Sequence, residues 1–485
     1  MRKHTRLQNR WLLAATPLTL GALVLSGCAV TAAQAESATT SGSAATADAG
    51  AYAEQVLAAN ADATTLNDDE WDASAAVTIT LDGTTASADG DGVIIDGSTV
   101  TITATGTYLL TGALKGQVIV AAPDDAIVAL VLDGATISST SAPAIDVVAA
   151  DDVVVSLTGA NSLSSTADVA TMRADTDLTI SGDGSLTVES AADGISASDD
   201  LVVLSGTIDV TAADDGLRGK DALVVEGGSV TVDVGGEGLK SDQTDDPASG
   251  YVWISGGTVT VAAGDDGIKD ETDVVVTGGD VTVTDSYEGI EAVTVVVSGG
   301  TVDVTASDDG INASAGTEAR GDDGSVLVVE GGDVTIDAQG DGFDSNGSAS
   351  VTGGTLTVWG PTNDGNGALD VNGAFTVDGG TVLAVGSAGM AVSPSGGTQG
   401  FLEASASGSA GDEVSIVDAS GTEVASFTAV KEFASVVYSS SDLTDGAEYS
   451  VLVNGTSAGT ATEGVAVTGG GFGGGGGPQG GPPQH

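Results

Sequence analysis

Residues 256–268 read GGTVTVAAGDDGI, and this phrase recurs along the chain as a glycine pair, a Val-x-Val strand, small residues and Asp/Glu-Gly-Ile/Leu. The pair ends at Gly228, Gly257, Gly279, Gly300, Gly332, Gly354 and Gly380. The acid of the closing element falls at Asp193, Asp215, Glu237, Asp266, Glu288, Asp309 and Asp341, with spacings of 22, 22, 29, 22, 21 and 32 residues. A base period near 22 residues with occasional insertions indicates a solenoid.

Each repeat contains short strands in which valine alternates with Thr or Asp, as in Val230 to Val232 and Val259 to Val261. This alternation places valine on one face of the strand and the polar residue on the other. Glycines and acidic pairs mark the turns, and no stretch of useful length has helical periodicity. We therefore predict an all-β protein, a right-handed parallel β-helix of about 22 residues per coil around a valine core.

Two other repeat architectures disagree with this pattern. Calcium-binding nonapeptide arrays repeat Gly-Gly-x-Gly-x-Asp every nine residues or so, and the chain has neither that phrase nor that period. A β-propeller blade needs about 40 residues with hairpin turns. Residues 76–180 read as less regular coils of the same kind, as expected for the capped end of a solenoid.

The N-terminus has the layout of an export signal. Four basic residues, Arg2, Lys3, Arg6 and Arg10, precede the apolar run 11–25, which is short for a bilayer span. The run leads into LSGC at 25–28, the form of a lipobox. We predict a lipoprotein signal peptide at 1–27 and lipid attachment at Cys28, so that the protein is extracellular and anchored to the cell membrane by its lipid alone. The alternative is an ordinary signal peptide cleaved after Ala-Gln-Ala at 33–35.

Composition divides the rest of the chain. Residues 28–70 are rich in Ala, Ser and Thr and poor in large apolar side chains, so we predict a disordered tether. The β-helix is expected over 71–399. Residues 400–463 lose the repeat but keep strand patterns, which predicts a small C-terminal β cap or subdomain. A disordered Gly/Pro tail is expected at 464–485.

Charge and histidine content exclude several function classes. The chain has 12 Lys+Arg and 69 Asp+Glu; loss of residues 1–27 removes four cations and no acid, which leaves a net charge of −61. Such a body does not bind nucleic acid or anionic lipid through its general field. His4 and His485 lie at the two ends, so the folded part has no imidazole for a Ser-His-Asp triad or a His-ligated zinc site.

The position three residues after each repeated acid changes charge along the chain. It is occupied by Ser196, Arg218, Lys240, Lys269, Glu291, Asn312, Asp344 and Asp370. Coils stack about 4.8 Å apart, so these residues should form a ladder that is cationic over three coils and then anionic. The functional interpretation is that Arg218, Lys240 and Lys269 bind sugar carboxylates, with Arg320 from the second insertion and Trp253 as a stacking residue. The alternative is that the cations only pair with the neighbouring acids.

The acids themselves predict a metal site. Stacked carboxylates repel one another unless they are neutralised or well solvated, and Ca²⁺ accepts flexible coordination by carboxylate and carbonyl oxygens. The densest patch consists of Asp265, Asp266, Asp270, Glu288, Glu291, Asp308, Asp309 and Asn312. We predict at least one Ca²⁺ site here; the alternative is a solvated acidic face.

Several phrases resemble a known family. They are GDDGIK (264–269), SYEGIE (286–291), SDDGIN (307–312), GDGFDSNG (340–347) and GPTNDGNGALD (360–370). Residues 76–460 resemble the bacterial carbohydrate-binding-domain lipoproteins, right-handed parallel β-helices similar in fold to certain pectate lyases. The resemblance implies Ca²⁺ in the helix and binding of an acidic plant polysaccharide such as polygalacturonate, or of cellulose. The extreme acidity and the Ala/Ser/Thr-rich surface depart from the family.

The expected function is therefore calcium-dependent, non-catalytic carbohydrate binding at the cell surface by a monomeric protein. One alternative is a pectate-lyase-like polysaccharide lyase, in which Lys240 or Lys269 would abstract a proton beside a uronate carboxylate. A cation in a row of carboxylates has its charged form stabilised, which makes it a poor base. The other alternative is a structural surface adhesin without a defined sugar ligand.

Overall fold

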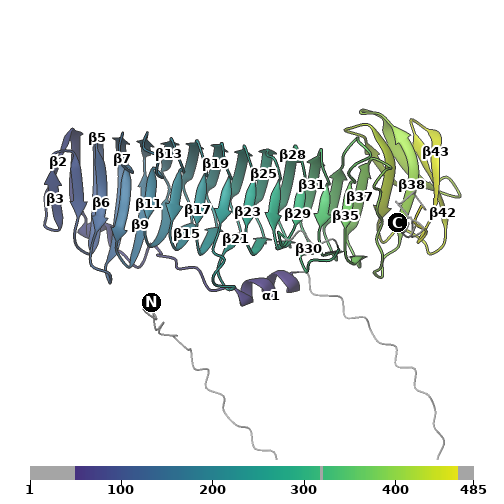
Figure 1. Ribbon diagram of the computed structural model, residues 1–485, viewed down its shortest axis with the longest axis horizontal. Coiled ribbons are helices and arrows are strands. Elements are labelled where there is room, and N and C mark those ends of the chain that lie inside the picture. The colour runs from purple at the N-terminus through teal and green to yellow at the C-terminus, as the bar shows by residue number, and fades with distance from the viewer. Residues whose placement is uncertain (1–49, 317–320, 468–485) are drawn as a thin grey trace, which may run out of the picture. The chain divides into compact units, whose positions relative to one another are not determined.

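The computed structural model describes residues 50–316 and 321–467, and in them the chain winds into a parallel β-helix (Figure 1). Each regular coil contributes three strands, which stack on the equivalent strands of neighbouring coils in three rows. The fold class predicted from the repeat is confirmed. Both long insertions, 242–250 and 314–325, lie between a strand of row C and the next strand of row B, as defined below.

The three rows are named here in the order in which the chain visits them. Row A contains β10 (Ala160–Ser165), β13 (Ser185–Ser190), β16 (Thr207–Ala212), β19 (Ser229–Val234), β22 (Thr258–Ala263), β25 (Asp280–Asp285), β28 (Thr301–Ala306), β31 (Asp333–Ala338), β34 (Thr355–Trp359) and β37 (Thr381–Gly386). Row C is a 13-stranded sheet of β3 (Val93–Asp96), β4 (Thr99–Ile102), β6 (Gln117–Ala121), β8 (Ile145–Ala149), β11 (Met172–Ala174), β14 (Ile195–Ala197), β17 (Leu217–Gly219), β20 (Leu239–Ser241), β23 (Ile268–Asp270), β26 (Ile290–Ala292), β29 (Ile311–Ala313), β32 (Phe343–Ser345) and β35 (Leu369–Val371). Row B contains β9 (Asp152–Thr158), β12 (Asp177–Gly182), β15 (Asp200–Val203), β18 (Ala222–Val225), β21 (Tyr251–Ile254), β24 (Asp273–Val276), β27 (Thr294–Val297), β30 (Val326–Val329), β33 (Ser348–Val351) and β36 (Phe375–Val377).

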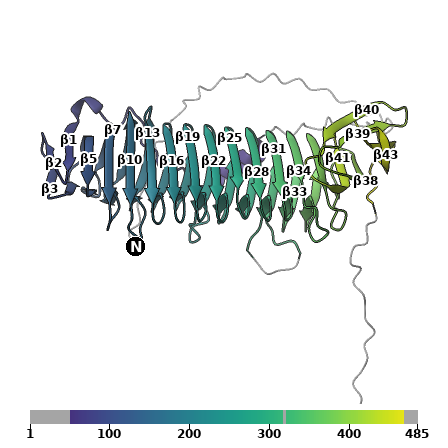
Figure 2. The same ribbon diagram turned by 90° about the horizontal axis from the view of Figure 1, so that it is seen from above.

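Rows A and B run side by side along the solenoid in Figures 1 and 2, and they join near the N-terminal end into one 26-stranded sheet. The long strand β7 (Ile127–Ser139) makes this connection, because its first half pairs with β9 and its second half with β10. Two antiparallel pairs end the solenoid there, β1 (Val77–Gly83) with β2 (Thr85–Ala88), and β3 with β4. Strand β5 (Gly106–Lys115) pairs with both β1 and β7.

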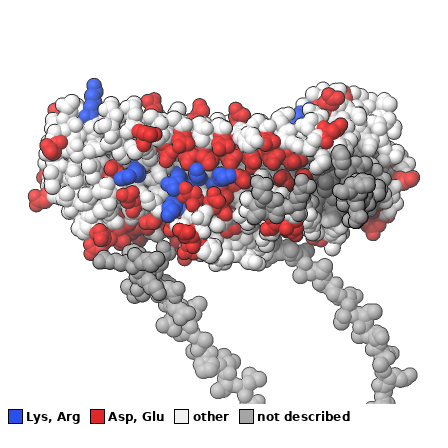
Figure 3. Space-filling view, in the orientation of Figure 1, with Lys and Arg blue, Asp and Glu red and all other residues white. Residues whose placement is uncertain are grey.

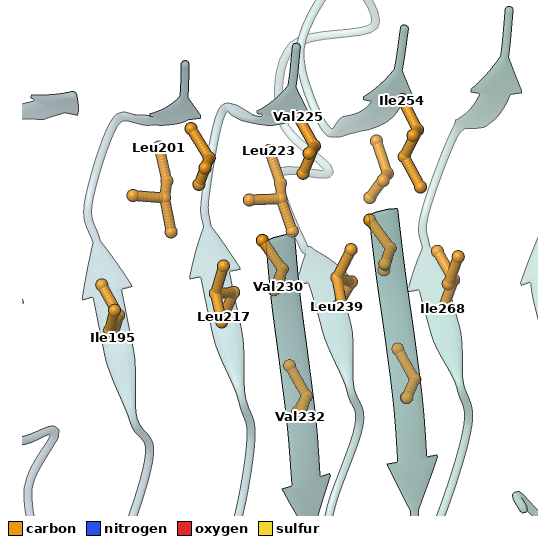
Figure 4. Packing of buried hydrophobic residues seen from close by; sticks show 14 of the residues in the cluster. Ile195, Leu201, Leu217, Leu223, Val225, Val230, Val232, Leu239, Ile254 and Ile268 are labelled. Carbon is orange, nitrogen blue, oxygen red and sulfur yellow. The ribbon is translucent and has the colours of Figure 1, made fainter. Parts of the chain in front are cut away.

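The core of the solenoid consists of aliphatic columns in strict register. Ile195, Leu217, Leu239 and Ile268 pair in sequence along row C and are fully buried (Figure 4). Each such side chain contributes about 1.5–3 kcal/mol by leaving water. Repeated at every coil, this burial aligns the outward-facing neighbours as well.

Glycine is required where one coil approaches the next at the turn from row A to row C. A Cβ on Gly238 would lie 2.3 Å from Cγ1 of Val261 and 2.5 Å from the carbonyl oxygen of Gly267. Gly257, in the turn from row B to row A, has φ +80° and also faces backbone of the preceding coil. The two glycine positions of the repeat therefore have different reasons, steric approach at the first and steric approach with a left-handed backbone at the second.

We expect Gly238→Ala to destabilise the protein by roughly 1–3 kcal/mol, because the added methyl group forces two coils apart. Gly396→Ala is the matched control, since its Cβ would meet only Cγ2 of Thr376 at 3.6 Å. Denaturant unfolding of both variants measures the difference. Equal stability of the two variants would contradict the role given to the close approach.

The C-terminal strands form a second packing unit. Strands β38 (Phe401–Gly408) and β41 (Phe433–Ser439) pair antiparallel, and β41 continues the sheet beyond β37. Strands β40 (Glu423–Thr428), β39 (Glu413–Asp418), β42 (Glu448–Val453) and β43 (Thr456–Thr462) form a four-stranded sheet. A separate apolar cluster that includes Leu402, Phe433 and Tyr449 holds these strands together. They occupy the segment for which the sequence predicts a β cap or subdomain.

The prediction of a disordered tether over 28–70 is wrong for residues 50–70. Helix α1 (Ala51–Ala59) lies against the outer face of row B (Figure 1), where Ala53 packs with Val275, Val296 and Val328. The carboxylate of Glu330, which is 6% exposed, accepts hydrogen bonds from the backbone N–H groups of Tyr52 and Ala53 at 2.9–3.1 Å. Residues 28–49 lie outside the described part of the chain.

After α1 the chain continues along row B toward the N-terminal coils. Tyr251 donates its hydroxyl proton to the carbonyl of Ala61 at 2.8 Å, and the N–H of Thr64 donates to Asp200 at 2.7 Å. Leu66 is buried against Ala129 and Val154. Its own composition is too polar to fold alone, so this segment is ordered by the apolar outer face of row B. A short 3₁₀ helix, Ala73–Ala75, then leads into β1. In the described residues no helix is both long enough and apolar enough to cross a membrane.

We expect Glu330→Ala to loosen residues 51–66, because two N–H groups at the start of α1 lose a charged acceptor worth roughly 1.5–3 kcal/mol. Glu226→Ala is the matched control: Glu226 occupies the same place after a row B strand but is exposed. Hydrogen exchange of the 51–66 peptides should rise in the first variant only. Unchanged protection in Glu330→Ala would refute this contact as the one that holds α1.

Candidate functional site

The outward-facing residues of row C form the ladder expected from the sequence. Strand pairing places Ser196, Arg218, Lys240, Lys269, Glu291, Asn312, Asp344 and Asp370 side by side in this order. The same column extends toward the N-terminus through Arg173 and Asp146. Figure 3 shows a short row of basic side chains across the middle of this face, with acidic side chains beside and beyond it.

Each cation of the column that the sequence singles out is paired with an acid. Arg218 binds both carboxylate oxygens of Asp242, which lies in the first insertion, at 2.7–3.0 Å. Lys240 binds Asp215 and Glu237. The pairing alternative stated above is therefore what the free protein shows. Arg173, which sequence analysis did not single out, is held in the same way by Asp146 at 3.0 Å.

The two lysines sit among carboxylates of the acid column. The Nζ atom of Lys240 lies 3.1 Å from Oδ2 of Asp215 and 3.0 Å from Oε1 of Glu237. Burial alone would lower the pKa of Lys240, but its contacts with Glu237 and Asp215 raise that pKa above the ordinary value. Lys269 contacts Asp266 at 3.1 Å and Glu291 more closely. Both ammonium groups are thus held in their charged form.

Beyond Glu291 the acids lack such partners. No ion pair among the described residues involves Asp309, Asp341, Asp344 or Asp370. Burial, together with the surrounding carboxylates, raises the pKa of Asp309 to about 7, that of Asp341 to about 6 and that of Asp344 to about 8. The charges of Asp309, Asp341, Asp370 and Glu288 all act on Asp344. This end of row C is therefore a half-buried acidic cluster without counter-ions of its own.

Asn312 stands inside that cluster with one polar atom unused. Its side chain is 8% exposed, and its Nδ2 donates to Oε2 of Glu288 at 3.0 Å. Its Oδ1 is buried and has no hydrogen-bond partner. A buried acceptor without a donor costs about 1–3 kcal/mol. The chemistry of this site, carboxylates around an unpaired amide oxygen, is that of a hard-cation site.

Comparison with known proteins supports one of these readings. Residues 96–326, just under half of the chain, match a family model described as carbohydrate-binding domain-containing protein. This part of the chain belongs to that family. The match includes row C from β4 to β29, and with them Arg218, Lys240, Lys269 and Asn312. It ends before β32, so Asp341 and Asp344 lie outside the matched residues.

A solved structure is also similar to the chain. It is titled a polysaccharide lyase-like protein from C. thermocellum, in a gadolinium derivative, and is 30% identical over 46% of this chain and 92% of its own. The TM-score is 0.42, so the fold is judged from the chain's own strand pairing. Among curated proteins no similar sequence was found.

The structure brings together part of the metal set expected in this carbohydrate-binding family member. Carboxylate oxygens of Asp266, Glu288 and Glu291 lie within 4.8 Å of one another. A second group of this kind, Asp214, Asp215 and Glu237, was not predicted. Asp265 and Asp308 each precede an acid of the column and lie at its edge. Asp309 and Asn312 lie further along it with Asp341 and Asp344, which the metal prediction omitted although Asp344 was placed in the ladder.

Asp270 is separated from the other predicted ligands. It follows Lys269 in β23 and therefore points into the solenoid, where it is 3% exposed and pairs in register with Ser241. One of its oxygens accepts hydrogen bonds from the N–H groups of Thr272 and Asp273. The period-2 alternation of the strand was sufficient to exclude Asp270, because neighbours in a strand face opposite sides.

The structure also separates Trp253 from the cations. Trp253 lies in row B, where it packs with α1 and donates from Nε1 to Oγ1 of Thr277 at 3.0 Å. Arg320 and Cys28 fall outside the described residues, so sugar contact by the first and lipid attachment to the second stay predictions. Tyr287 is the aromatic residue that does reach the acidic face, with 49% of its surface exposed.

The raised carboxyl pKa values make a pH prediction for the metal-free protein. An unfolded Asp titrates near pH 3.9, whereas Asp309, Asp341 and Asp344 hold their protons up to about pH 6–8 in the fold. The folded state therefore binds more protons between these limits, and stability falls as pH rises from about 4 to 8.

We expect the melting temperature measured in chelator to be lower at pH 8 than at pH 5, and this slope to be reduced in Asp344→Asn. Asp280→Asn, at an exposed position of row A, serves as the control. If Asp344→Asn and Asp280→Asn show the same slope, Asp344 does not carry the effect.

Proposed function

We propose that the protein binds an acidic polysaccharide through a Ca²⁺ ion held at the C-terminal part of row C, and that it does not cleave the polymer. Carbohydrate binding is supported by the family match over residues 96–326. The single observation behind the metal is the buried, unpaired Oδ1 of Asn312 among carboxylates that have no cationic partner.

The residues present fit this ion. Glu288, Asp309 and Asp344 offer carboxylate oxygens and Asn312 offers an amide oxygen, which are the hard ligands that Ca²⁺ prefers. Three such carboxylates also repel one another in a half-buried setting. Bound Ca²⁺ would supply positive charge that both relieves this repulsion and attracts a uronate carboxylate. Asn312 would orient the site through its hydrogen bond to Glu288.

The basic side chains are poor alternatives for binding a sugar acid. Arg218, Lys240 and Lys269 each have acidic partners already, and a uronate group would have to displace one of these carboxylates. The surrounding acids repel an anionic polymer as well. The proposed ion therefore supplies positive charge at the one end of row C where the chain's own cations are missing.

Tyr287 is the proposed contact for the sugar ring. It precedes Glu288 in the chain, and its ring stands exposed beside the acid column. An exposed aromatic face beside a charged site suits a sugar, whose C–H groups pack on the ring while its hydroxyl groups stay in water. The neighbouring carboxylate of Asp308 raises the pKa of the Tyr287 phenol, so it stays protonated at neutral pH.

Lyase chemistry is less favoured than binding. A lysine base must lose its proton, and the pKa of Lys240 is raised by Glu237 and Asp215. Lys269 is likewise held between Asp266 and Glu291. Accumulation of an unsaturated uronide product during incubation with polygalacturonate would decide for the lyase.

Calorimetry with polygalacturonate, in millimolar Ca²⁺ and again after chelation, tests the proposal. We expect saturable binding that is lost on chelation. Asn312→Ala should weaken Ca²⁺ binding and polymer binding together, whereas Asp280→Ala, in the exposed part of row A, should change neither. Binding that survives chelation would refute the role of the ion, and no binding under either condition would refute the acidic polymer.

Tyr287→Ala separates the sugar contact from the metal. We expect polymer binding to weaken about tenfold, a typical loss for an aromatic contact residue, with Ca²⁺ binding unchanged. Tyr287→Phe keeps the ring and should bind like the unaltered protein. Equal polymer affinity in all three proteins would exclude a contact with Tyr287.

A further inference from the structure

We infer that Lys240 and Lys269 take the place of divalent cations in two carboxylate clusters of row C, so that metal binding is confined to the coils after β26. The inference deepens the proposed function, because it states where along the ladder a metal ion enters. It depends on the contacts of the two lysines and on the register of row C.

The first cluster surrounds Lys240. Oxygens of Asp214, Asp215 and Glu237 approach within 4.8 Å of one another, which is close enough to share one cation. The ammonium group of Lys240 supplies that cation, with Oδ2 of Asp215 at 3.1 Å and Oε1 of Glu237 at 3.0 Å. The Lys240 side chain is 21% exposed and that of Asp215 is 9% exposed, so solvent ions cannot replace this contact freely.

The second cluster surrounds Lys269 in the next coil. Asp266, Glu288 and Glu291 converge in the same way, and Lys269 contacts the first and the last of them. Both clusters that have the spacing of a metal site therefore already hold a cation from the chain. A divalent ion would have to enter within a few ångströms of an ammonium group, where like charges repel strongly in a half-buried site.

The register explains why the pattern changes after β23. Lys269 pairs with Glu291 in β26, and Asn312, Asp344 and Asp370 then follow at the same position. Between Glu291 and Asp370 no described residue of the column is basic. The acid column nevertheless continues through Glu288, Asp309 and Asp341. The chain thus neutralises the middle coils itself and leaves the later ones to an external ion.

The test is the number of Ca²⁺ ions bound, measured by calorimetry on the purified protein and its variants. Lys240→Gln should bind one more Ca²⁺ than the unaltered protein, because three converging carboxylates lose their resident cation. Lys240→Arg keeps the charge and should gain none. Lys115→Gln removes one positive charge at an exposed position far from the clusters and should also gain none.

Hydrogen exchange supplies a second readout that needs no substitution. Chelation should reduce protection in peptides from 286–370 and leave those from 207–241 unchanged. In Lys240→Gln, protection of 207–241 should become dependent on Ca²⁺.

The inference is overturned if Lys240→Gln gains no ion, if Lys115→Gln gains one equally, or if chelation loosens 207–241 in the unaltered protein. An unaltered protein that binds no Ca²⁺, with one ion gained in Lys240→Gln, would refute the proposed function and still support this inference.

Discussion

Repulsion between stacked carboxylates is the constraint on which the charged face of this protein depends. The turn from row A to row C brings successive coils so close that only glycine fits, and the acid before that glycine is carried into register with it. Parallel strands repeat about every 4.8 Å, so every coil adds an acid next to the last one. A solenoid built this way has to bring counter-charge to the column or protonate it.

The chain meets this constraint in two ways along its length. In the middle coils, long basic side chains from the outward position of row C reach back to the acids, as Lys240 does to Asp215 and Glu237. In the later coils that position is itself acidic or an amide, and burial raises the carboxyl pKa values there. The same structural position therefore contributes a cation to one part of the protein and a potential cation ligand to another.

Row B shows how a solenoid protects an apolar outer face. Val275, Val296 and Val328 point away from the core, and α1 covers them with Ala53 and its neighbours. Glu330 fixes the beginning of the helix, because its carboxylate accepts the N–H groups that a helix leaves unpaired at that end. The three sides of the helix thereby differ in character: row B is covered, row C is charged and row A is exposed and rich in Thr and Asp.

The sequence by itself determined the fold and the order of the row C ladder, from Ser196 to Asp370. Both follow from local rules, since a 22-residue period sets the coil and period-2 alternation sets which side chains face outward. Only the tertiary structure decided that Arg218 pairs with Asp242 from an insertion, that Asn312 has an unpaired oxygen, and that residues 51–66 lie on row B. These features depend on side-chain reach and on contacts between residues up to 278 positions apart, which no local pattern encodes. Asp270 was the exception, because the strand alternation already placed it inside.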